Sequence, residues 1–252
     1  MTVAPYSQTE GEVAESALLG GRVRLRQPVK GYRAGMDAAL LAAAVSAEPG
    51  QRVIEAGCGA GAVLMQIAAR RAGAALTGLE RDPAMAALAR ENAALNSAEA
   101  SILEGDVAAG FRALDLPPFD WAVSNPPFFD DPSALRAPAE GKRGAWMADD
   151  GLKAWTTFLL KSVREGGRIV VIHRADRLAD LLSLLGERAG SFAVRGVHPH
   201  GDEPAKRVLV QAIKTGKAPL RLLPPLVLHD RSGAKHTAEA EAILRGEAAL
   251  PF

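Results

Sequence analysis

Near the start of the chain, polar and hydrophobic positions alternate with a period of two. Val23 and Leu25 are separated by basic residues, which predicts a half-exposed strand with a basic face made of Arg22, Arg24 and Arg26. The Ala- and Leu-rich run 38–45 then predicts a helix, with Asp37 as its N-terminal cap. Residues 1–20 are polar and acidic without periodicity, so we expect a mobile tail.

From residue 52 onward, short apolar runs alternate with longer amphipathic segments. Strands are expected over 53–56, 75–79, 101–103, 121–124, 168–173, 192–197 and 208–213, and helices over 62–71, 83–96, 152–164 and 177–188. Alternating strands and helices predict an α/β fold, with a largely parallel sheet covered by helices on both faces.

The length of 252 residues suits a single domain over 21–252, which can bury roughly 70–75% of its unfolded surface. We expect this domain to carry a basic N-terminal extension over about 21–48 and an irregular appendage with several prolines over about 216–252. No internal repeat is visible.

Composition excludes several classes of protein. A single cysteine excludes a disulfide framework and a cysteine-based zinc site. The longest uncharged stretch has 14 residues, whereas a membrane span needs about 20. We therefore expect a cytoplasmic protein that does not enter a membrane. The net charge of +1 is uninformative about nucleic acid, because the position of the charges matters more than their sum.

A glycine-rich turn joins strand 53–56 to the helix after it. Its glycines are spaced two apart and allow positive φ and close approach to a ligand, at Gly57, Gly59 and Gly61. Gly57, Gly59 and Ala62 also fit the loose dinucleotide pattern G-x-G-x-x-G/A. Glu55 favours the cationic S-adenosylmethionine (SAM) over NAD, because a carboxylate would repel a pyrophosphate. Cys58 is expected to be a small filler of the turn.

Two further acidic residues follow strands. Glu80 ends the second strand of the repeat and is suited to accept hydrogen bonds from ribose hydroxyls. Asp106 follows the third strand and is suited to the amine of an adenine. Both are expected at the sheet edge where ligands bind in parallel α/β folds.

The fourth strand ends in the motif Asn125-Pro126-Pro127-Phe128. An amine conjugated to a ring is a poor nucleophile, because its lone pair is delocalised. The Asn125 side-chain oxygen and the Pro126 carbonyl are suited to accept both amine hydrogens and to favour a pyramidal nitrogen. Phe128 offers a face on which a planar base can stack.

These motifs resemble those of class I SAM-dependent methyltransferases that act on amines, and more narrowly the bacterial tRNA adenine-N6 methyltransferases that modify an anticodon-loop adenine of a valine tRNA. The resemblance covers roughly residues 20–245 and rests on the segments 31–42, 55–59 and 125–128, with further similarity around 228–230 and 237–239. It implies a Rossmann-like, mostly parallel seven-stranded sheet, SAM as cofactor and no metal. It also implies N6-methylation of an adenine in tRNA.

Similarity to related amino-methyltransferases also suggests that residues 35–37, with Asp37, close over the methionine end of SAM, and that Asn125 touches both cofactor and amine. Relatives with the same Asn-Pro-Pro motif methylate protein glutamine amides, which remains an alternative acceptor. Two rivals from other classes are an NAD(P)-dependent oxidoreductase and a non-catalytic RNA-binding module.

Basic residues occur in two stretches that lack acids. The first contains the candidate RNA contacts Arg22, Arg24, Arg26, Lys30 and Arg33, and the second contains Lys206, Arg207, Lys214, Lys217 and Arg221. Beside an adenine-directed site, such locally unbalanced charge favours RNA. Arg136, Lys142 and Arg143 in the loop after Phe128 are further candidates for phosphate contacts.

The remaining histidine and tryptophan signals are weaker. The spacing of His198 and His200 suits a metal pair, but no third ligand lies nearby in the sequence, so we expect a turn. Trp121 is expected in the core. Trp146 and Trp155 flank the long proline-containing loop and are candidates to cover a substrate pocket.

Overall fold

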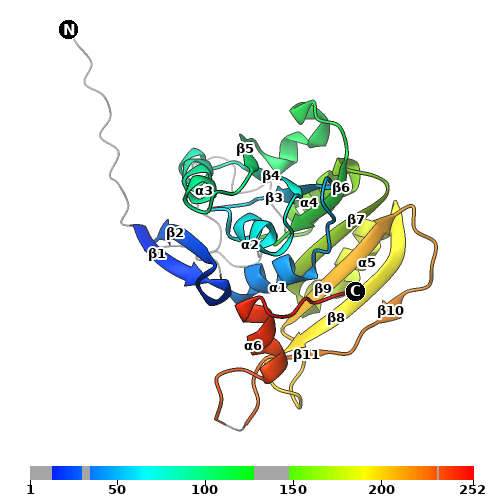
Figure 1. Ribbon diagram of the computed structural model, residues 1–252. Helices are drawn as coiled ribbons and strands as arrows, with labels where there is room; N and C mark the ends of the chain where they lie inside the picture. Colours follow the sequence, from blue (N-terminus) through cyan, green and yellow to red (C-terminus); the bar gives the residue numbers. More distant parts are fainter. Residues whose placement is uncertain (1–12, 30–34, 128–147, 232) are drawn as a thin grey trace.

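The computed structural model describes residues 13–29, 35–127, 148–231 and 233–252 (Figure 1). Seven long strands form the centre, as the sequence predicted: β3 (Arg52–Ala56), β4 (Ala75–Glu80), β5 (Ala100–Glu104), β6 (Phe119–Ser124), β7 (Val163–Arg174), β8 (Ala189–His198) and β9 (Arg207–Lys214). Two short strands, β10 (Arg221–Leu222) and β11 (Leu226–Val227), pair with β8 and extend the sheet to nine strands.

The strand order is β10-β8-β9-β7-β6-β3-β4-β5, with β11 also on β8. Only β9 runs antiparallel to its neighbours, and the other pairs described in this sheet are parallel. Because the glycine loop and the other candidate segments follow parallel strands, their residues gather at one edge of the sheet, the carboxyl edge.

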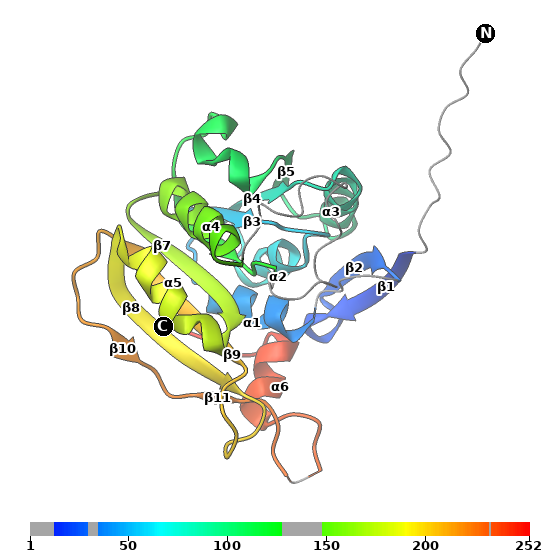
Figure 2. The same ribbon diagram turned by 180° about the vertical axis from the view of Figure 1, so that it is seen from behind.

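Helices cover both faces of the sheet. One face carries α1 (Met36–Ala44), α2 (Ala62–Arg70) and α3 (Pro83–Leu95), and the other carries α4 (Ala148–Ser162) and α5 (Leu178–Gly186), as Figures 1 and 2 show from opposite sides. The short 3-10 turns η2 (Val107–Ala109) and η3 (Phe111–Leu114) lie on the α4 face, and η4 (Ala175–Arg177) precedes α5.

Strand β6 is buried on both faces of the sheet. Trp121 and Val123 belong to the core beneath α1, α2 and α3, whereas Ala122 belongs to the core beneath α4 and α5. Phe119 joins the second core because the strand register is irregular between Phe119 and Trp121. Successive side chains of a strand point to opposite faces, so a strand buried on both faces is apolar throughout. This confirms Trp121 as a core residue, 1% exposed.

The expected tail over 1–20 is wrong for its last part. Val13–Leu18 forms strand β1, which pairs antiparallel with β2 (Val23–Pro28), and the 3-10 turn η1 (Leu19–Gly21) joins them. No side chain of β1 is fully buried, so the strand lacks the apolar alternation that would identify it in the sequence. Backbone hydrogen bonds to β2 and the ion pairs of Glu15 stabilise it.

The C-terminal segment is not the irregular appendage that its prolines suggested. It contains α6 (Ala238–Arg245), which is capped by Thr237 and lies beside α1 (Figure 1). Ile243 and Leu250 join the core beneath α1, at 1% and 2% exposure. The prolines therefore do not prevent this segment from packing, because Leu226, Ile243 and Leu250 are all buried in that core.

Among the described residues, no helix has the length and apolar character needed to cross a membrane.

Candidate active site

Four neighbouring strands end side by side at the carboxyl edge. Ala56 of β3 pairs with Ser124 of β6 on one side and with Leu79 of β4 on the other, and Glu80 pairs with Glu104 of β5. Adjacent strands are about 4.8 Å apart. The glycine loop after β3 therefore lies between the acidic residue of β4 and the Asn-Pro-Pro motif after β6.

The glycine loop is held to the end of β4 by its own backbone. The amides of Gly57 and Cys58 both donate to the Leu79 carbonyl, at 2.8 and 3.0 Å. All three glycines have positive φ, between 54° and 82°, which confirms that this turn requires glycine. Cys58 is 5% exposed, and burial raises the pKa of its thiol, so it acts as a filler and not as a nucleophile.

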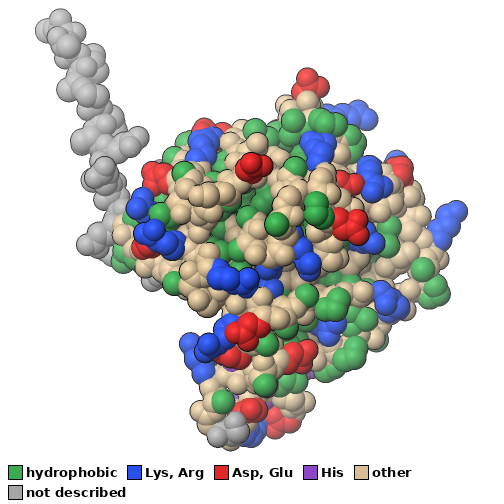
Figure 3. Space-filling view, viewed as in Figure 1, with side chains coloured by type: hydrophobic (Ala, Val, Ile, Leu, Met, Phe, Trp, Pro, Cys, Tyr) green, Lys and Arg blue, Asp and Glu red, His purple; other side chains and the backbone are tan. Residues whose placement is uncertain are grey.

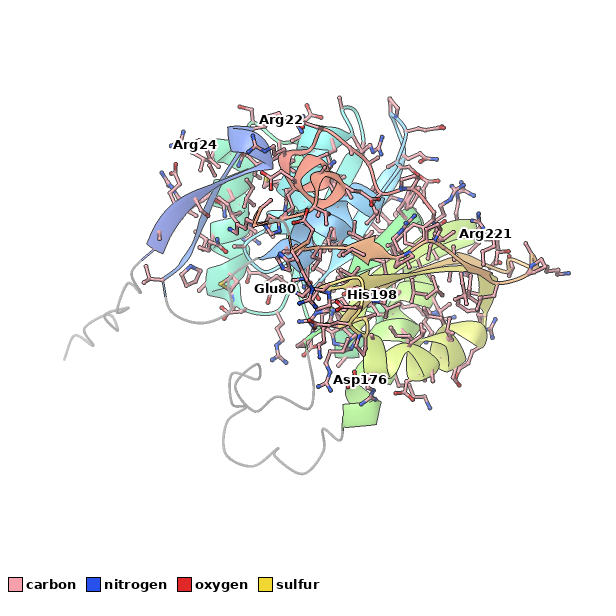
Figure 4. The ribbon with its side chains drawn as sticks, turned by 90° about the horizontal axis from the view of Figure 1, so that it is seen from below. Arg22, Arg24, Glu80, Asp176, His198 and Arg221 are labelled. Carbon is pink, nitrogen blue, oxygen red and sulfur yellow. The ribbon has the colours of Figure 1, made fainter. Side chains whose placement is uncertain are left out.

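Glu80 stabilises the loop directly. One carboxylate oxygen accepts from the Gly59 amide and the other accepts from the Asp82 amide, both at 2.9 Å. The side chain is half-buried at the carboxyl edge (Figure 4). Each carboxylate oxygen has a second lone pair, so these bonds leave acceptor capacity for ribose hydroxyls.

Glu55 lies deeper than its place near the strand end suggested. It is 2% exposed, and its Oε2 has no hydrogen-bond partner among the described residues. Burial, followed by the neighbouring charge of Glu80, raises the pKa of this carboxyl well above its usual range, while a backbone hydrogen bond at Leu64 acts in the opposite direction. A buried acceptor beside a second carboxylate suits a cationic ligand group.

Asp106 lies at the same edge, after β5, and is exposed. Its Oδ1 accepts from the Ala108 amide at 2.8 Å and thereby caps η2. The capping bond orients the carboxylate, and exposure leaves it accessible to a ligand.

The Asn-Pro-Pro motif is fixed by the strand before it. The Ser124 hydroxyl donates to the Ala56 carbonyl at 2.9 Å and ties the end of β6 to the start of the glycine loop. Asn125 is half-buried, and Pro126 is buried. Phe128 lies outside the described residues, as do Lys30 and Arg33.

Trp155 of α4 lies against the first glycine of the loop. A Cβ added at Gly57 would be 2.3 Å from the indole Cη2 atom, so a side chain at this position would collide with the ring. Gly57 is therefore needed both for its φ and for the close approach of Trp155. The sequence had suggested only that Trp155 lies near a pocket, and the structure places it on the glycine loop.

Asp37 is not the cap of α1, which corrects the sequence-based prediction. The N-cap residue is Gly35, and Asp37 lies in the first turn of the helix. Its Oδ2 accepts from the Arg207 Nε atom at 2.9 Å. The side chain of Asp37 is 23% exposed and that of Arg207 is 31% exposed. This ion pair joins the start of α1 to the start of β9 at the carboxyl edge.

Positively charged groups surround His173 near the end of β7. His173 is 3% exposed, and its Nδ1 accepts from the Arg174 amide at 2.7 Å. Burial first, and then the charges of Arg177, Arg174 and Arg207, lower the pKa of His173 from 6.5 to about 4. The imidazole is therefore neutral at pH 7.

The buried imidazole predicts a specific loss of stability in acid. Below pH 6.5 the unfolded chain takes up a proton that the folded chain refuses, so stability falls as the pH drops from about 6.5 to 4. The slope of this contribution approaches about 1.4 kcal/mol per pH unit. His173→Asn keeps an acceptor but cannot titrate, so its urea-unfolding free energy should fall less steeply over this range. Parallel pH profiles for variant and wild type would contradict this.

The three arginines near β2 do not act alike. Arg24 and Arg26 alternate with buried residues on β2 and share Glu15 of β1, at 2.8 and 3.4 Å. Basic side chains lie over this hairpin in Figure 3, and Arg24 is labelled in Figure 4. Arg22 precedes β2, and its guanidinium donates to the carbonyl of Gly246 at 2.8 Å at the end of α6. The expectation that all three share one strand face is therefore wrong for Arg22, which holds the C-terminal helix.

Asn92 of α3 and Asn96, the C-cap residue of α3, form hydrogen bonds with the backbone of β2. The side chain of Asn96 exchanges both amide hydrogen bonds with the backbone of Arg24, and the side chain of Asn92 does the same with Arg26. Asn92 also donates to the Ala60 carbonyl at 2.9 Å, so it links the hairpin to the glycine loop. These side-chain contacts to the hairpin and the glycine loop were not predicted from the sequence. Two weak helix formers four residues apart on a helix were the available signal.

The second acid-free stretch does not form one basic patch. Lys206 and Arg207 lie at the carboxyl edge, whereas Lys214 lies at the far end of β9, about 24 Å away for a strand of this length, and donates to the Val163 carbonyl. Arg221 lies at the opposite end of the molecule from Arg22 and Arg24 (Figure 4). Arg136, Lys142, Arg143 and Trp146 lie outside the described residues.

The histidines make backbone contacts. His198 Nδ1 lies 2.7 Å from the Glu203 carbonyl, and His200 Nδ1 lies 3.2 Å from the His229 carbonyl. Within the described part of the chain, no group of three or more His, Cys, Asp or Glu side chains is arranged to hold a metal ion.

Known proteins are similar to this chain in sequence. Residues 33–137 match the family model described as methyltransferase small domain. A tRNA1(Val) (adenine(37)-N6)-methyltransferase from Porphyromonas gingivalis is 32% identical over 59% of this chain and 61% of its own length. A release factor glutamine methyltransferase from Deinococcus radiodurans is 38% identical over 35% of this chain and 30% of its own. The chain thus spans less than two thirds of either relative.

Solved structures share the fold. A predicted O-methyltransferase from Agrobacterium tumefaciens has a TM-score of 0.69 and 29% identity, over 86% of this chain and 99% of its own. A 16S rRNA N2 G1207 methyltransferase from T. thermophilus, in complex with AdoMet and guanosine, has a TM-score of 0.59 and 22% identity, over 84% and 53%.

Proposed function

Since the chain has a class I SAM-dependent methyltransferase fold and carries a methyltransferase small domain, we propose that it methylates the exocyclic N6 amine of an adenine in RNA, with a tRNA of the valine type as substrate. The predicted fold class and the predicted cofactor, SAM, are thereby confirmed. Methyl transfer by the whole chain and the identity of its acceptor are our proposal.

The residues at the carboxyl edge fit SAM. We assign the ribose hydroxyls to Glu80, the adenine amine to Asp106 and the methionine end to the turn of Gly57, Gly59 and Gly61, with Asp37 and Asn125 beside it. The buried Glu55 oxygen without a partner supports a cationic ligand near this turn. Bound SAM would supply an electrophilic methyl group on its sulfonium.

The single observation that carries the proposal is the position of the Asn-Pro-Pro motif. Ser124 ties it to the strand end from which the glycine loop begins, so an amine held by Asn125 and the Pro126 carbonyl lies next to the cofactor turn. Two acceptors on one amine favour the pyramidal geometry in which the nitrogen lone pair is available. We assign no general base, because a methylated ammonium-like product is acidic enough to lose its proton to water.

A protein glutamine amide remains the second candidate acceptor. It has the same delocalised lone pair and needs the same two acceptors, and one relative is a release factor glutamine methyltransferase. The outward-facing Arg24 and Arg26 on the hairpin favour RNA. The NAD(P)-dependent oxidoreductase is set aside, since the matching family model and the relatives reported above are all methyltransferases.

One experiment separates these acceptors. Purified protein is incubated with methyl-labelled SAM and total RNA, and in parallel with ribonuclease-treated protein extract, both from a strain that lacks this gene. We expect label in tRNA as N6-methyladenosine. Label in protein alone would establish the amide acceptor, and SAM binding without label in either fraction would indicate a non-catalytic RNA-binding module.

The RNA proposal also predicts a change in salt dependence. RNA binding releases counterions, with a slope of roughly −0.7 in log K against log salt per phosphate contact for single strands. Arg24→Ala with Arg26→Ala should therefore flatten the slope by about one to two units and raise KM for tRNA, while SAM affinity stays unchanged. The measurement is tRNA binding at several salt concentrations.

A charge-matched control is available for this experiment. Lys161 and Arg188 are exposed and lie at the end of α4 and just before β8, away from the hairpin. Their double alanine variant removes the same charge and should leave the slope near that of wild type. Equal slopes for both double variants would remove the hairpin from the RNA-binding surface. Arg22 is left intact, because its loss would disturb α6.

A further inference from the structure

A mostly apolar cavity of about 320 Å³ lies on the α5 face of the sheet, beyond β7. Its lining includes Leu178 at the start of α5, Val194, Gly196 and His198 of β8, Ala205 before β9, and Leu223 after β10. The volume is at the lower end of the roughly 300–1,000 Å³ of small-molecule sites. His198 is the only titratable side chain among the residues that line it.

His198 is held in one orientation. Its Nδ1 lies 2.7 Å from the Glu203 carbonyl and therefore donates to it, which makes Nε2 an acceptor. A Cβ added at Gly196 would lie 2.8 Å from Nε2, so the edge of the ring lies directly over this glycine. The ring thus adds a flat face and one acceptor to an otherwise aliphatic lining.

The cavity opens near the edge that carries the Asn-Pro-Pro motif. His198 ends β8 and Ala205 precedes β9, so both lie at the carboxyl edge (Figure 4). Strands β6, β7, β9 and β8 are consecutive in the sheet, so three strand spacings of about 4.8 Å separate β6 from β8. The pairing registers place Asn125 level with Arg195, three residues before His198, which adds about 10 Å along the strand and gives a separation of about 17 Å. A stacked strand of nucleic acid rises ~3.4 Å per nucleotide, so this separation spans about five stacked nucleotides or fewer unstacked ones.

The edge between the two positions carries four cationic side chains and three carboxylates that pair with them. Arg174 ends β7 and Arg177 ends η4 after it, while Lys206 precedes β9 and Arg207 begins it, all at this edge. Asp176, Asp180 and Asp37 pair with three of them, and Lys206 is exposed. With four cations and three acids, the edge keeps one positive charge in excess, and the exposed Lys206 is suited to contact a phosphate of a strand that crosses it.

We propose that this cavity binds a second unpaired base of the substrate RNA, a few nucleotides from the methylated adenine, with His198 stacked on it. The inference rests on the proposed RNA methylation. A planar heterocycle matches the flat ring, the aliphatic walls and the single acceptor, and the exposed Lys206 at the edge suits a phosphate of the segment that connects it to the target adenine. The cavity would then help to select the sequence around the modified position.

The first test fills or alters the cavity and measures KM for an unmodified valine tRNA transcript. Ala205→Leu fills the cavity, and Ala94→Leu makes the same change on the exposed side of α3. His198→Ala removes the ring, whereas His198→Phe keeps a stacking face. Stacking on an aromatic side chain accounts for roughly 5- to 150-fold in affinity. We expect KM to rise by about that factor for Ala205→Leu and His198→Ala only, with SAM affinity unchanged.

The second test identifies the base. Transcripts that carry one abasic site are scanned over the nucleotides on each side of the target adenine. At the position whose base enters the cavity, removal of the base should raise KM for wild type and add no further increase for His198→Ala. Circular dichroism and thermal unfolding confirm that each variant is folded, and His198→Phe supports the assignment if Ala205→Leu is unstable.

The outcomes distinguish the two proposals. If wild type methylates no RNA, the proposed function fails, and with it this inference. If wild type methylates tRNA but Ala205→Leu, His198→Ala and Ala94→Leu share one KM, the cavity does not bind a base and only this inference is overturned. An effect of the cavity variants on methylation of a protein amide instead would assign the cavity to a peptide substrate.

Discussion

Replacing Asn125 with alanine is expected to lower kcat by on the order of 10²–10³ while SAM binds with wild-type affinity. Asn125 is proposed to accept one hydrogen of the target amine, an interaction that becomes stronger as the nitrogen turns pyramidal. Ser124 holds the strand end through the Ala56 carbonyl, so the backbone at Asn125 should survive the substitution. Single-turnover methylation and calorimetry with SAM measure the two effects separately.

Two controls sharpen this experiment. Asn125→Gln keeps the amide group but displaces its oxygen, so its kcat should also be strongly reduced. That result would show that the position of the oxygen matters, and not merely the presence of a polar group. Because no ionisable side chain is assigned as a base, the rate of wild type should show no sharp dependence near neutral pH. An essential ionisable side chain revealed by such a dependence would refute the mechanism, and full activity of Asn125→Ala would refute the assignment of the site.

Loss of the ribose and adenine acceptors should weaken SAM binding strongly. Glu80→Ala and Asp106→Ala each remove an acceptor for a ligand group that loses water on binding, and such a loss typically costs ~1–3 kcal/mol, or about 5- to 150-fold in affinity. Glu80→Ala should have the larger effect, because its carboxylate also holds the Gly59 amide of the cofactor turn. Isothermal calorimetry with SAM is the direct measurement.

Glu99→Ala is the matched control for these two variants. Glu99 is an exposed acid just before β5, at the opposite end of that strand from Asp106, and its removal changes the charge equally. Its SAM affinity should equal that of wild type. Wild-type affinity in both Glu80→Ala and Asp106→Ala would remove these residues from the site.

Most of the central fold could be predicted from the sequence, because its patterns depend on local physics. Period-two and helical spacings of apolar residues identified the seven long strands of the sheet and the helices between them. The glycine turn was equally readable, since three residues with positive φ in a row of five require glycine at alternate positions. Parallel strands then bring their ends to one edge, so Glu80, Asp106 and Asn125 were grouped correctly without coordinates.

What the sequence did not predict depends on contacts between distant segments. Arg22 belongs by spacing to the basic strand, yet it bonds to the end of α6, 224 residues away. Asp37 has the type and place of a helix cap, but its carboxylate pairs with Arg207 across the carboxyl edge. A charged or polar side chain has many possible partners, and its own sequence neighbourhood does not say which one folding brings near.

In the functional site, too, some features are encoded locally and others depend on the tertiary structure. The chain by itself determined that a glycine turn, two acids and an Asn-Pro-Pro motif follow successive strands, because backbone conformation and strand period are properties of short segments. Only the tertiary structure decided that Trp155 lies on Gly57, that Asn92 links β2 to the loop, and that His198 faces an apolar cavity. Packing of this kind depends on shapes brought together from across the chain, and no short segment encodes it alone.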